Sequence, residues 1–161
     1  MKLLFLFIAT FQLSFALIIT PEDALKQSLH AKNVTKKAMI LTKDEHQKIQ
    51  QLAKSKLKSK LFRLYTASSD DKVLGHGILL TQKVRSKTTA ILYMIDTKGE
   101  LLAIEVIAFN EPKEYMPSKR WLKQFNEEPQ KISSITGATL SANAVKRAAK
   151  LAQAIWEVKF Q

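Results

Sequence analysis

The spacing of apolar residues changes near the middle of the chain, from a helical period to a strand-like pattern. Residues 21–31 and 43–60 have apolar positions at helical spacing, and each stretch follows a threonine that can cap a helix, Thr20 or Thr42. A glutamate three residues after Thr42 completes the spacing of a capping box. The pattern predicts two helices there, while residues 34–41 between them are ambiguous in period.

Four later runs are rich in Leu, Ile, Val, Tyr and Thr, which is typical of strands. They are residues 61–66, 73–84, 88–96 and 101–109, and short turn-forming segments separate them. From Ala144 to Val158, apolar residues then recur four, three, four and three positions apart, as in a helix that packs on a sheet. The sequence therefore predicts an α+β fold with N-terminal helices, an antiparallel four-stranded sheet and a closing C-terminal helix.

The first residues predict a secretory signal peptide. Lys2 supplies a positive start, residues 3–13 form an apolar run, and Ser14 and Ala16 are small residues where a signal peptidase reads. We expect cleavage after Ala16 and a periplasmic or other extracytoplasmic location. A retained anchor is the alternative, because the apolar run continues to Ile19 and then approaches the minimum length of a membrane span. The predicted divisions are residues 1–16 as signal peptide, 17–60 as an N-terminal helical segment and 61–161 as the main domain.

The chain contains no cysteine and has a formal net charge of +12. Without thiols it has no disulfides, thiolate metal sites or iron–sulfur clusters. Nucleic acid is not an expected partner, because we expect export and find no nucleic-acid motif. The surplus charge has two open explanations, a solvated surface or docking to acidic partners and anionic membrane surfaces. Both also apply to four lysines expected on the outer side of the second helix, Lys54, Lys56, Lys58 and Lys60.

The segment from Ile132 to Ser141 is rich in small and hydroxyl residues and leads into the last predicted helix. Thr139 lies at the junction, where an N-cap residue belongs. The free amides of a first helical turn and the helix dipole both attract negative charge there. Gly137 lets the backbone turn sharply or approach a bulky group. Taken alone, the same pattern also describes an ordinary loop and helix cap.

Residues 136–139, Thr-Gly-Ala-Thr, resemble the flavinylation signature of the FMN-binding domain family, Asp-x-x-(Ser/Thr)-Gly-Ala-(Thr/Ser). The family includes the C subunit of the sodium-pumping quinone reductase, the G subunit of the Rnf complex and many small exported flavoproteins. The leading Asp of the signature is Ser133 in this chain. Further similarity, in an order and spacing like those of the small exported members, lies in residues 84–87, 105–112, Tyr115 and 120–122.

The resemblance implies an electron-transfer flavoprotein more than a stand-alone enzyme. In the family the last threonine of the signature carries FMN through a phosphoester bond, and that residue corresponds to Thr139. A separate flavin transferase makes the bond, and membrane or periplasmic oxidoreductases are the expected redox partners. The positions expected around FMN are Thr139, Thr136, Gly137, Ala138, Ser141, Arg85, Lys87, Glu111, Tyr115 and Trp121.

Several of these positions have a second interpretation. Arg85 and Lys87 either face the phosphate or the ring, or are exposed loop cations. Trp121 either stacks on the flavin ring or packs in the core. Because Ser133 replaces the acid, a flavin-free binding or adaptor module of the same fold is the alternative function. His76 has no metal-ligand spacing, so we expect a structural or surface histidine.

Overall fold

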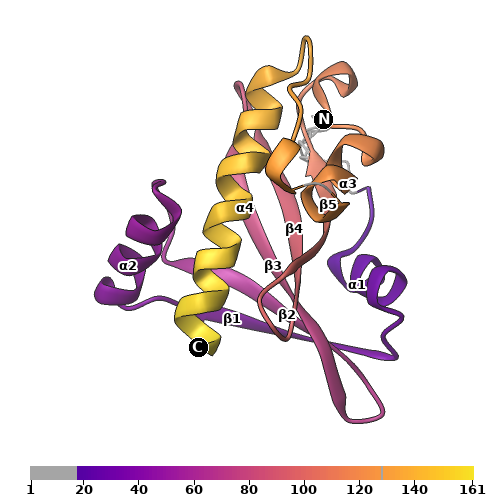
Figure 1. The fold of residues 1–161 in the computed structure, drawn as a ribbon, viewed down its shortest axis with the longest axis vertical. Helices are drawn as coiled ribbons and strands as arrows, with labels where there is room; N and C mark the ends of the chain where they lie inside the picture. The colour runs from indigo at the N-terminus through magenta and orange to yellow at the C-terminus, as the bar shows by residue number, and fades with distance from the viewer. Residues whose placement is uncertain (1–17, 128) are drawn as a thin grey trace, which may run out of the picture.

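The computed structural model describes residues 18–127 and 129–161, and Figure 1 shows them as one twisted sheet with helices packed on it. The strands follow one another in the order β1-β2-β3-β4-β5, and every neighbouring pair is antiparallel. The elements are α1 (Pro21–Leu29), β1 (Asn33–Ile40), α2 (Lys43–Ala53), β2 (Leu61–Ser69), β3 (Lys72–Lys83), β4 (Thr88–Asp96), β5 (Leu101–Phe109), a short 3₁₀ turn (Lys113–Tyr115), α3 (Lys119–Glu127), a second 3₁₀ turn (Pro129–Lys131) and α4 (Thr139–Phe160).

The sheet has five strands, so the predicted four-stranded sheet is wrong by one strand. The additional strand is β1, which pairs with β2 from Asn33 opposite Ser68 to Ile40 opposite Leu61. It lies at the edge of the sheet, and most of its side chains are exposed. An edge strand with little burial on either face lacks the apolar alternation that identifies a strand in a sequence. This explains why its period was ambiguous.

Both predicted helix starts near the N-terminus are confirmed, but the second helix is shorter than expected. Thr20 Oγ1 accepts a hydrogen bond from the Asp23 amide, and Thr42 and Glu45 form a complete capping box. Helix α2 ends at Ala53, where Lys54 adopts a left-handed conformation with φ of 49°. The four lysines from 54 to 60 therefore do not form one side of a helix, because all four lie in the connection between Ala53 and β2, with Lys54 as the helix C-cap.

Helix α4 crosses one face of the sheet (Figure 1) and forms the larger core with it. The predicted apolar stripe is confirmed, since Ala144, Ala148, Leu151 and Ile155 are all buried. Lys146, a charged residue outside this stripe, is half-buried, and its Nζ donates to the Ile132 carbonyl at 3.0 Å. Helix α4 therefore covers the sheet and also holds the segment that precedes it.

The opposite face of the sheet carries a smaller core under α1. His76 lies in the central strand β3 and is half-buried, with its ring stacked on Phe160 of α4 at 4.5 Å between ring centres and its Nδ1 3.2 Å from Thr66 Oγ1. Burial lowers the pKa of His76. In the part of the chain that the structure describes, no helix combines the length and apolarity that a membrane span requires. The predicted signal peptide, residues 1–16, lies outside the described residues.

Candidate functional site

Three connecting segments gather at one end of the sheet, at the top of Figure 1. They are residues 84–87 between β3 and β4, residues 110–117 after β5, and residues 132–138 before α4. The opposite end holds the β4–β5 turn, where Gly99 packs directly against Trp156 near the end of α4. Because α4 runs along the sheet between these two ends, its N-terminus lies beside the first two connections.

Thr139 is the first residue of α4 and not its N-cap, which corrects the predicted junction. The N-cap is Ala138, whose side chain makes no capping hydrogen bond, and the first turn contains no acidic residue. A tight turn places Ala138 there, with its amide donating to the Ile135 carbonyl at 3.2 Å. The Thr139 side chain is exposed, and its Oγ1 donates only a long 3.3 Å hydrogen bond to the same carbonyl. Its hydroxyl is therefore accessible to another molecule.

The start of α4 has the properties of an anion-binding site. The helical hydrogen bonds begin with the Ala142 amide donating to Ala138, so the amides of residues 139–141 precede the first of them. The positive end of a 22-residue helix lies at the same place. Neither a side-chain cap nor a first-turn carboxylate neutralises it. An anion placed at Thr139 would meet both the free amides and the dipole.

Space for such a group lies directly before the helix. Gly137 has φ of +79°, and a Cβ added there would have no heavy atom within 4 Å. Ser141 is 1% exposed, and its Oγ has no hydrogen-bond partner among the described residues. Of the remaining signature residues, Thr136 is exposed and Ala138 is buried. The turn thus combines open space, two exposed hydroxyls and one buried hydroxyl without a partner.

Glu111 organises the connection between β3 and β4. Its Oε1 accepts the amide hydrogens of Arg85 at 3.1 Å, Ser86 and Lys87 at 2.7 Å, and the Ser86 hydroxyl also donates to it. Hydrogen bonds from the Lys87 and Ser86 amides hold the pKa of Glu111 below its usual value. The sequence places this carboxylate among the groups around FMN, whereas in this structure it accepts its hydrogen bonds from the loop of residues 85–87.

Arg85 and Tyr115 connect this loop to the segment after β5. The Arg85 guanidinium lies 3.9 Å from the centre of the Tyr115 ring, a cation–π contact. Both Arg85 and Lys87 are exposed at the same end of the sheet as Thr139, whereas Tyr115 is half-buried. The structure therefore brings these three candidate residues, from two other segments, to the end of the sheet where α4 begins.

Trp121 holds the turn from inside the core. The residue is 5% exposed, its ring packs edge-to-face on Phe125, and its Nε1 donates to the Ser133 carbonyl at 3.0 Å. A flavin could contact this ring only if the covering residues moved. Packing in the core, the second of the two interpretations of Trp121, therefore accounts for its position. Ser133 also interacts through its amide and Oγ with Gln124 Oε1, at 2.8 and 3.0 Å. Gln124 was absent from the sequence prediction, because nothing in the sequence indicates this contact.

The fold and the site define a small α+β domain whose closing helix begins at an exposed hydroxyl and an uncompensated anion site. The model of the FMN-binding domain family matches residues 85–154, which contain every candidate position named above. A search of the curated proteins found no match to the chain. Within the described residues, no group of three His, Cys, Asp or Glu side chains is arranged to hold a metal ion.

Proposed function

We propose that this protein is an exported flavoprotein that carries electrons between membrane oxidoreductases and an acceptor, with FMN joined through its phosphate to Thr139. The observation that carries the proposal is the start of α4 within the matched domain. There an exposed Thr139 hydroxyl, the amides of the first turn and the open space at Gly137 lie together. Bound FMN supplies one- and two-electron chemistry through its ring.

Each group in the turn has a defined task in this proposal. Thr139 Oγ1 forms the new bond to phosphorus when a separate flavin transferase uses FAD as donor, and AMP leaves from the other side of that phosphorus. The hydroxyl proton is released, and the phosphodiester keeps one negative charge. The amides of residues 139–141 and the helix dipole stabilise that charge. Ser141 Oγ, which is buried and has no hydrogen-bond partner among the described residues, is a further donor at the same turn once the residues that cover it move.

Export is part of the proposal because of the sequence at residues 1–16. A covalent tether retains the cofactor outside the cytoplasm, where a dissociated flavin would be lost. Arg85 and Lys87 supply positive charge at the same end of the molecule. Positive charge near a flavin favours its reduced, anionic form.

A second function, a flavin-free binding or adaptor module, is favoured by one observation. Ser133 occupies the position of the acid in the flavinylation signature, and its hydroxyl is bound to Gln124. With serine at this position, the chain lacks the carboxylate that the family signature contains. The two functions differ in whether Thr139 receives FMN.

The experiment is co-expression of the full chain with a flavin transferase, followed by intact mass measurement and in-gel fluorescence after denaturation. The expected result is a gain of one FMN less one water, lost in Thr139→Ala and retained in Thr136→Ala, which removes the neighbouring exposed hydroxyl. Ser133→Asp should load faster than the wild type. A colourless wild type together with a yellow Ser133→Asp would establish the flavin-free module, and covalent flavin on Thr139→Ala would refute the site.

A further inference from the structure

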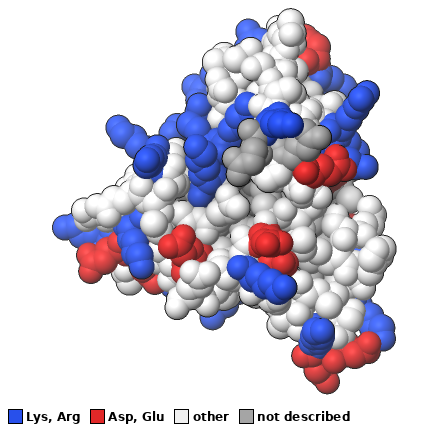
Figure 2. Space-filling view, viewed as in Figure 1, with Lys and Arg blue, Asp and Glu red and all other residues white. Residues whose placement is uncertain are grey.

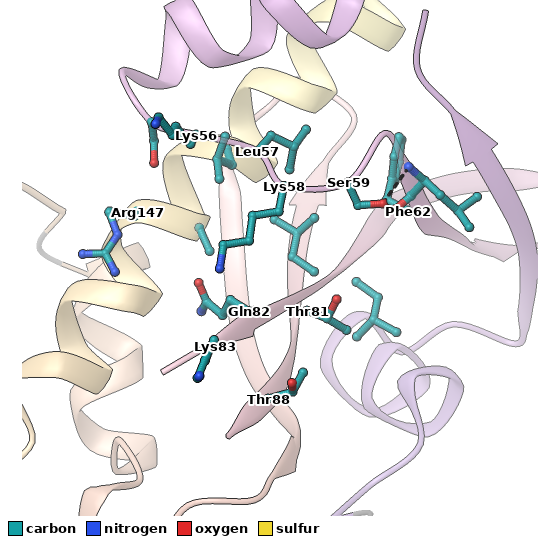
Figure 3. A pocket seen from close by; sticks show the side chains of 16 residues that line it. Lys56, Leu57, Lys58, Ser59, Phe62, Thr81, Gln82, Lys83, Thr88 and Arg147 are labelled. Carbon is teal, nitrogen blue, oxygen red and sulfur yellow. Dashed lines mark hydrogen bonds between the residues drawn. The ribbon is translucent and has the colours of Figure 1, made fainter. Parts of the chain in front are cut away.

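A cavity of about 400 Å³ lies beside α4, and no residue of the flavin-attachment turn, residues 132–139, lines it. It forms where β3 extends beyond the start of β2, since the first β2–β3 pair is Arg63 with Leu79 while β3 continues to Lys83. The connection from α2 to β2 closes one side, and the middle of α4 closes another. Figure 3 shows side chains from all three elements around this space.

Four cations line the cavity, and they come from three separate parts of the chain. Lys56 and Lys58 belong to the α2–β2 connection, Lys83 to the end of β3 and Arg147 to α4. In Figure 3 the Lys58 side chain reaches across the cavity toward Gln82, and Arg147 borders the space from the helix. Figure 2 shows Lys and Arg gathered over this flank of the molecule.

These positive charges are not compensated within the described protein. None of the described residues that line the cavity is acidic. None of the four cations forms an ion pair in residues 18–127 and 129–161, although lysines 32, 36, 119 and 159 elsewhere each have a carboxylate partner. Like charges held around one space repel each other, and an anion placed between them relieves that repulsion.

The lining also has an apolar part. Leu57, Phe62, Leu80 and Leu151 contribute to it, next to the hydroxyl groups of Ser55, Thr81 and Thr88. Such a wall suits an organic ligand with one strongly charged group better than a bare ion. A phosphate ester carries up to two negative charges on several acceptor oxygens, so it can receive several Lys and Arg donors at once, whereas a carboxylate has one charge and two oxygens.

We propose that this cavity binds the phosphate group of an organic phosphate ester, at a site separate from the flavin-attachment turn. The same chemistry is present in a soluble phosphate ester and in the headgroup of an anionic phospholipid. Thr139, the proposed attachment point, does not line the cavity, whereas Lys83 and Thr88 flank the loop of residues 84–87. Binding is therefore tested on protein that carries no flavin.

The test uses the full chain produced without a flavin transferase. Glycerol phosphate is titrated at constant ionic strength while amide NMR shifts of residues 55–59 and 80–83 are followed, with sodium chloride as the reference titration. Binding to vesicles of phosphatidylglycerol and of phosphatidylcholine is measured by sedimentation. The variants are Lys58→Gln and Arg147→Gln, and Lys150→Gln is the matched control because Lys150 is exposed on α4 outside this cavity. Melting temperatures verify that each variant is folded.

We expect each cavity variant to weaken binding about tenfold, as the loss of a charge-assisted hydrogen bond does. Lys150→Gln should change the binding affinity by less than about twofold, because the Lys150 charge is exposed and screened. Binding of glycerol phosphate identifies a soluble ligand, and binding to phosphatidylglycerol vesicles alone identifies a lipid headgroup. All variants share residues 1–17, so a difference between them arises at the cavity. Equal loss in Lys150→Gln, equal shifts with chloride, or no binding to either probe would overturn the proposal.

Discussion

Two glycines with positive φ provide a test of whether the space before α4 serves the cofactor. Gly137 has φ of +79° and open space where a Cβ would lie, whereas Gly99 has φ of +97° and a Cβ there would lie 2.5 Å from the Trp156 ring. Replacing each glycine by alanine therefore introduces the same methyl group at two backbone positions of similar conformation. One position belongs to the proposed site, and the other lies at the opposite end of the sheet.

The structure predicts different stability costs for the two variants. A left-handed conformation costs an alanine roughly 1–2 kcal/mol, and the lower entropy of the unfolded chain returns about 0.4–1 kcal/mol. Gly137→Ala should therefore lower the free energy of unfolding by about 1 kcal/mol, or about 2–4 °C in Tm. Gly99→Ala adds a clash with a large ring, and overpacking of this kind brings the total to roughly 2–4 kcal/mol.

Flavin loading should change in the opposite order. In Gly137→Ala the methyl group projects into the space assigned to the phosphate, so loading by the flavin transferase should fall about tenfold, since misplacement of roughly 1 Å near a reacting group costs up to ~100-fold. Gly99→Ala should load at the wild-type rate per folded molecule. Loading is measured as the ratio of flavin absorbance to protein, on samples whose Tm is measured in parallel. Wild-type loading in Gly137→Ala would refute the assignment of this space to the cofactor.

Three other predictions concern single groups. Ser141→Ala should leave the Tm within about 2 °C of wild type or raise it, because the buried Oγ has no hydrogen-bond partner to lose. The same variant should slow flavin loading, and unchanged loading would remove Ser141 from the site. Glu111→Gln should destabilise the protein at pH 7, and the difference in Tm from wild type should shrink as the pH falls below the unfolded pKa of about 4.3. The reason is that the folded pKa of Glu111 is lowered mainly by the Lys87 amide, so the carboxylate contributes stability only while it is ionised. A Tm difference that is constant from pH 7 to pH 3 would contradict this. Lys159→Met should remove the 2.7 Å ion pair with Glu45 and lower the free energy of unfolding by about 1 kcal/mol or less, since both side chains are partly solvated. The difference in Tm between wild type and variant should be smaller in thermal melts at high salt than at low salt.

Elements whose signal is local could be predicted from the sequence alone. The capping box at Thr42 and the boundaries of β4 and β5 follow from neighbouring residues, and the structure confirms them. The period of the α4 stripe also requires only the sequence, because one face of a long helix must be apolar to cover a sheet. The turn before α4 was identified from four consecutive residues, and the family match includes it.

Elements that lack such a signal depend on contacts that form only in the folded protein. Strand β1 is recognisable only through its pairing with β2, since an exposed edge strand has no apolar alternation. Helix α2 had acceptable helix formers beyond Ala53, and its end is set by the left-handed Lys54. Helix propensity is too weak to fix a boundary that packing and capping can move by several residues.

The same limit applies to the site. Glu111 reaches Arg85, Ser86 and Lys87 across 24 to 26 residues of sequence. Its carboxylate and the three amides meet because β3, β4 and β5 lie side by side, so that the loop after β3 and the end of β5 occupy the same end of the sheet. Sequence patterns record which neighbours along the chain favour one local conformation, whereas contacts of this kind exist only after the strands have paired.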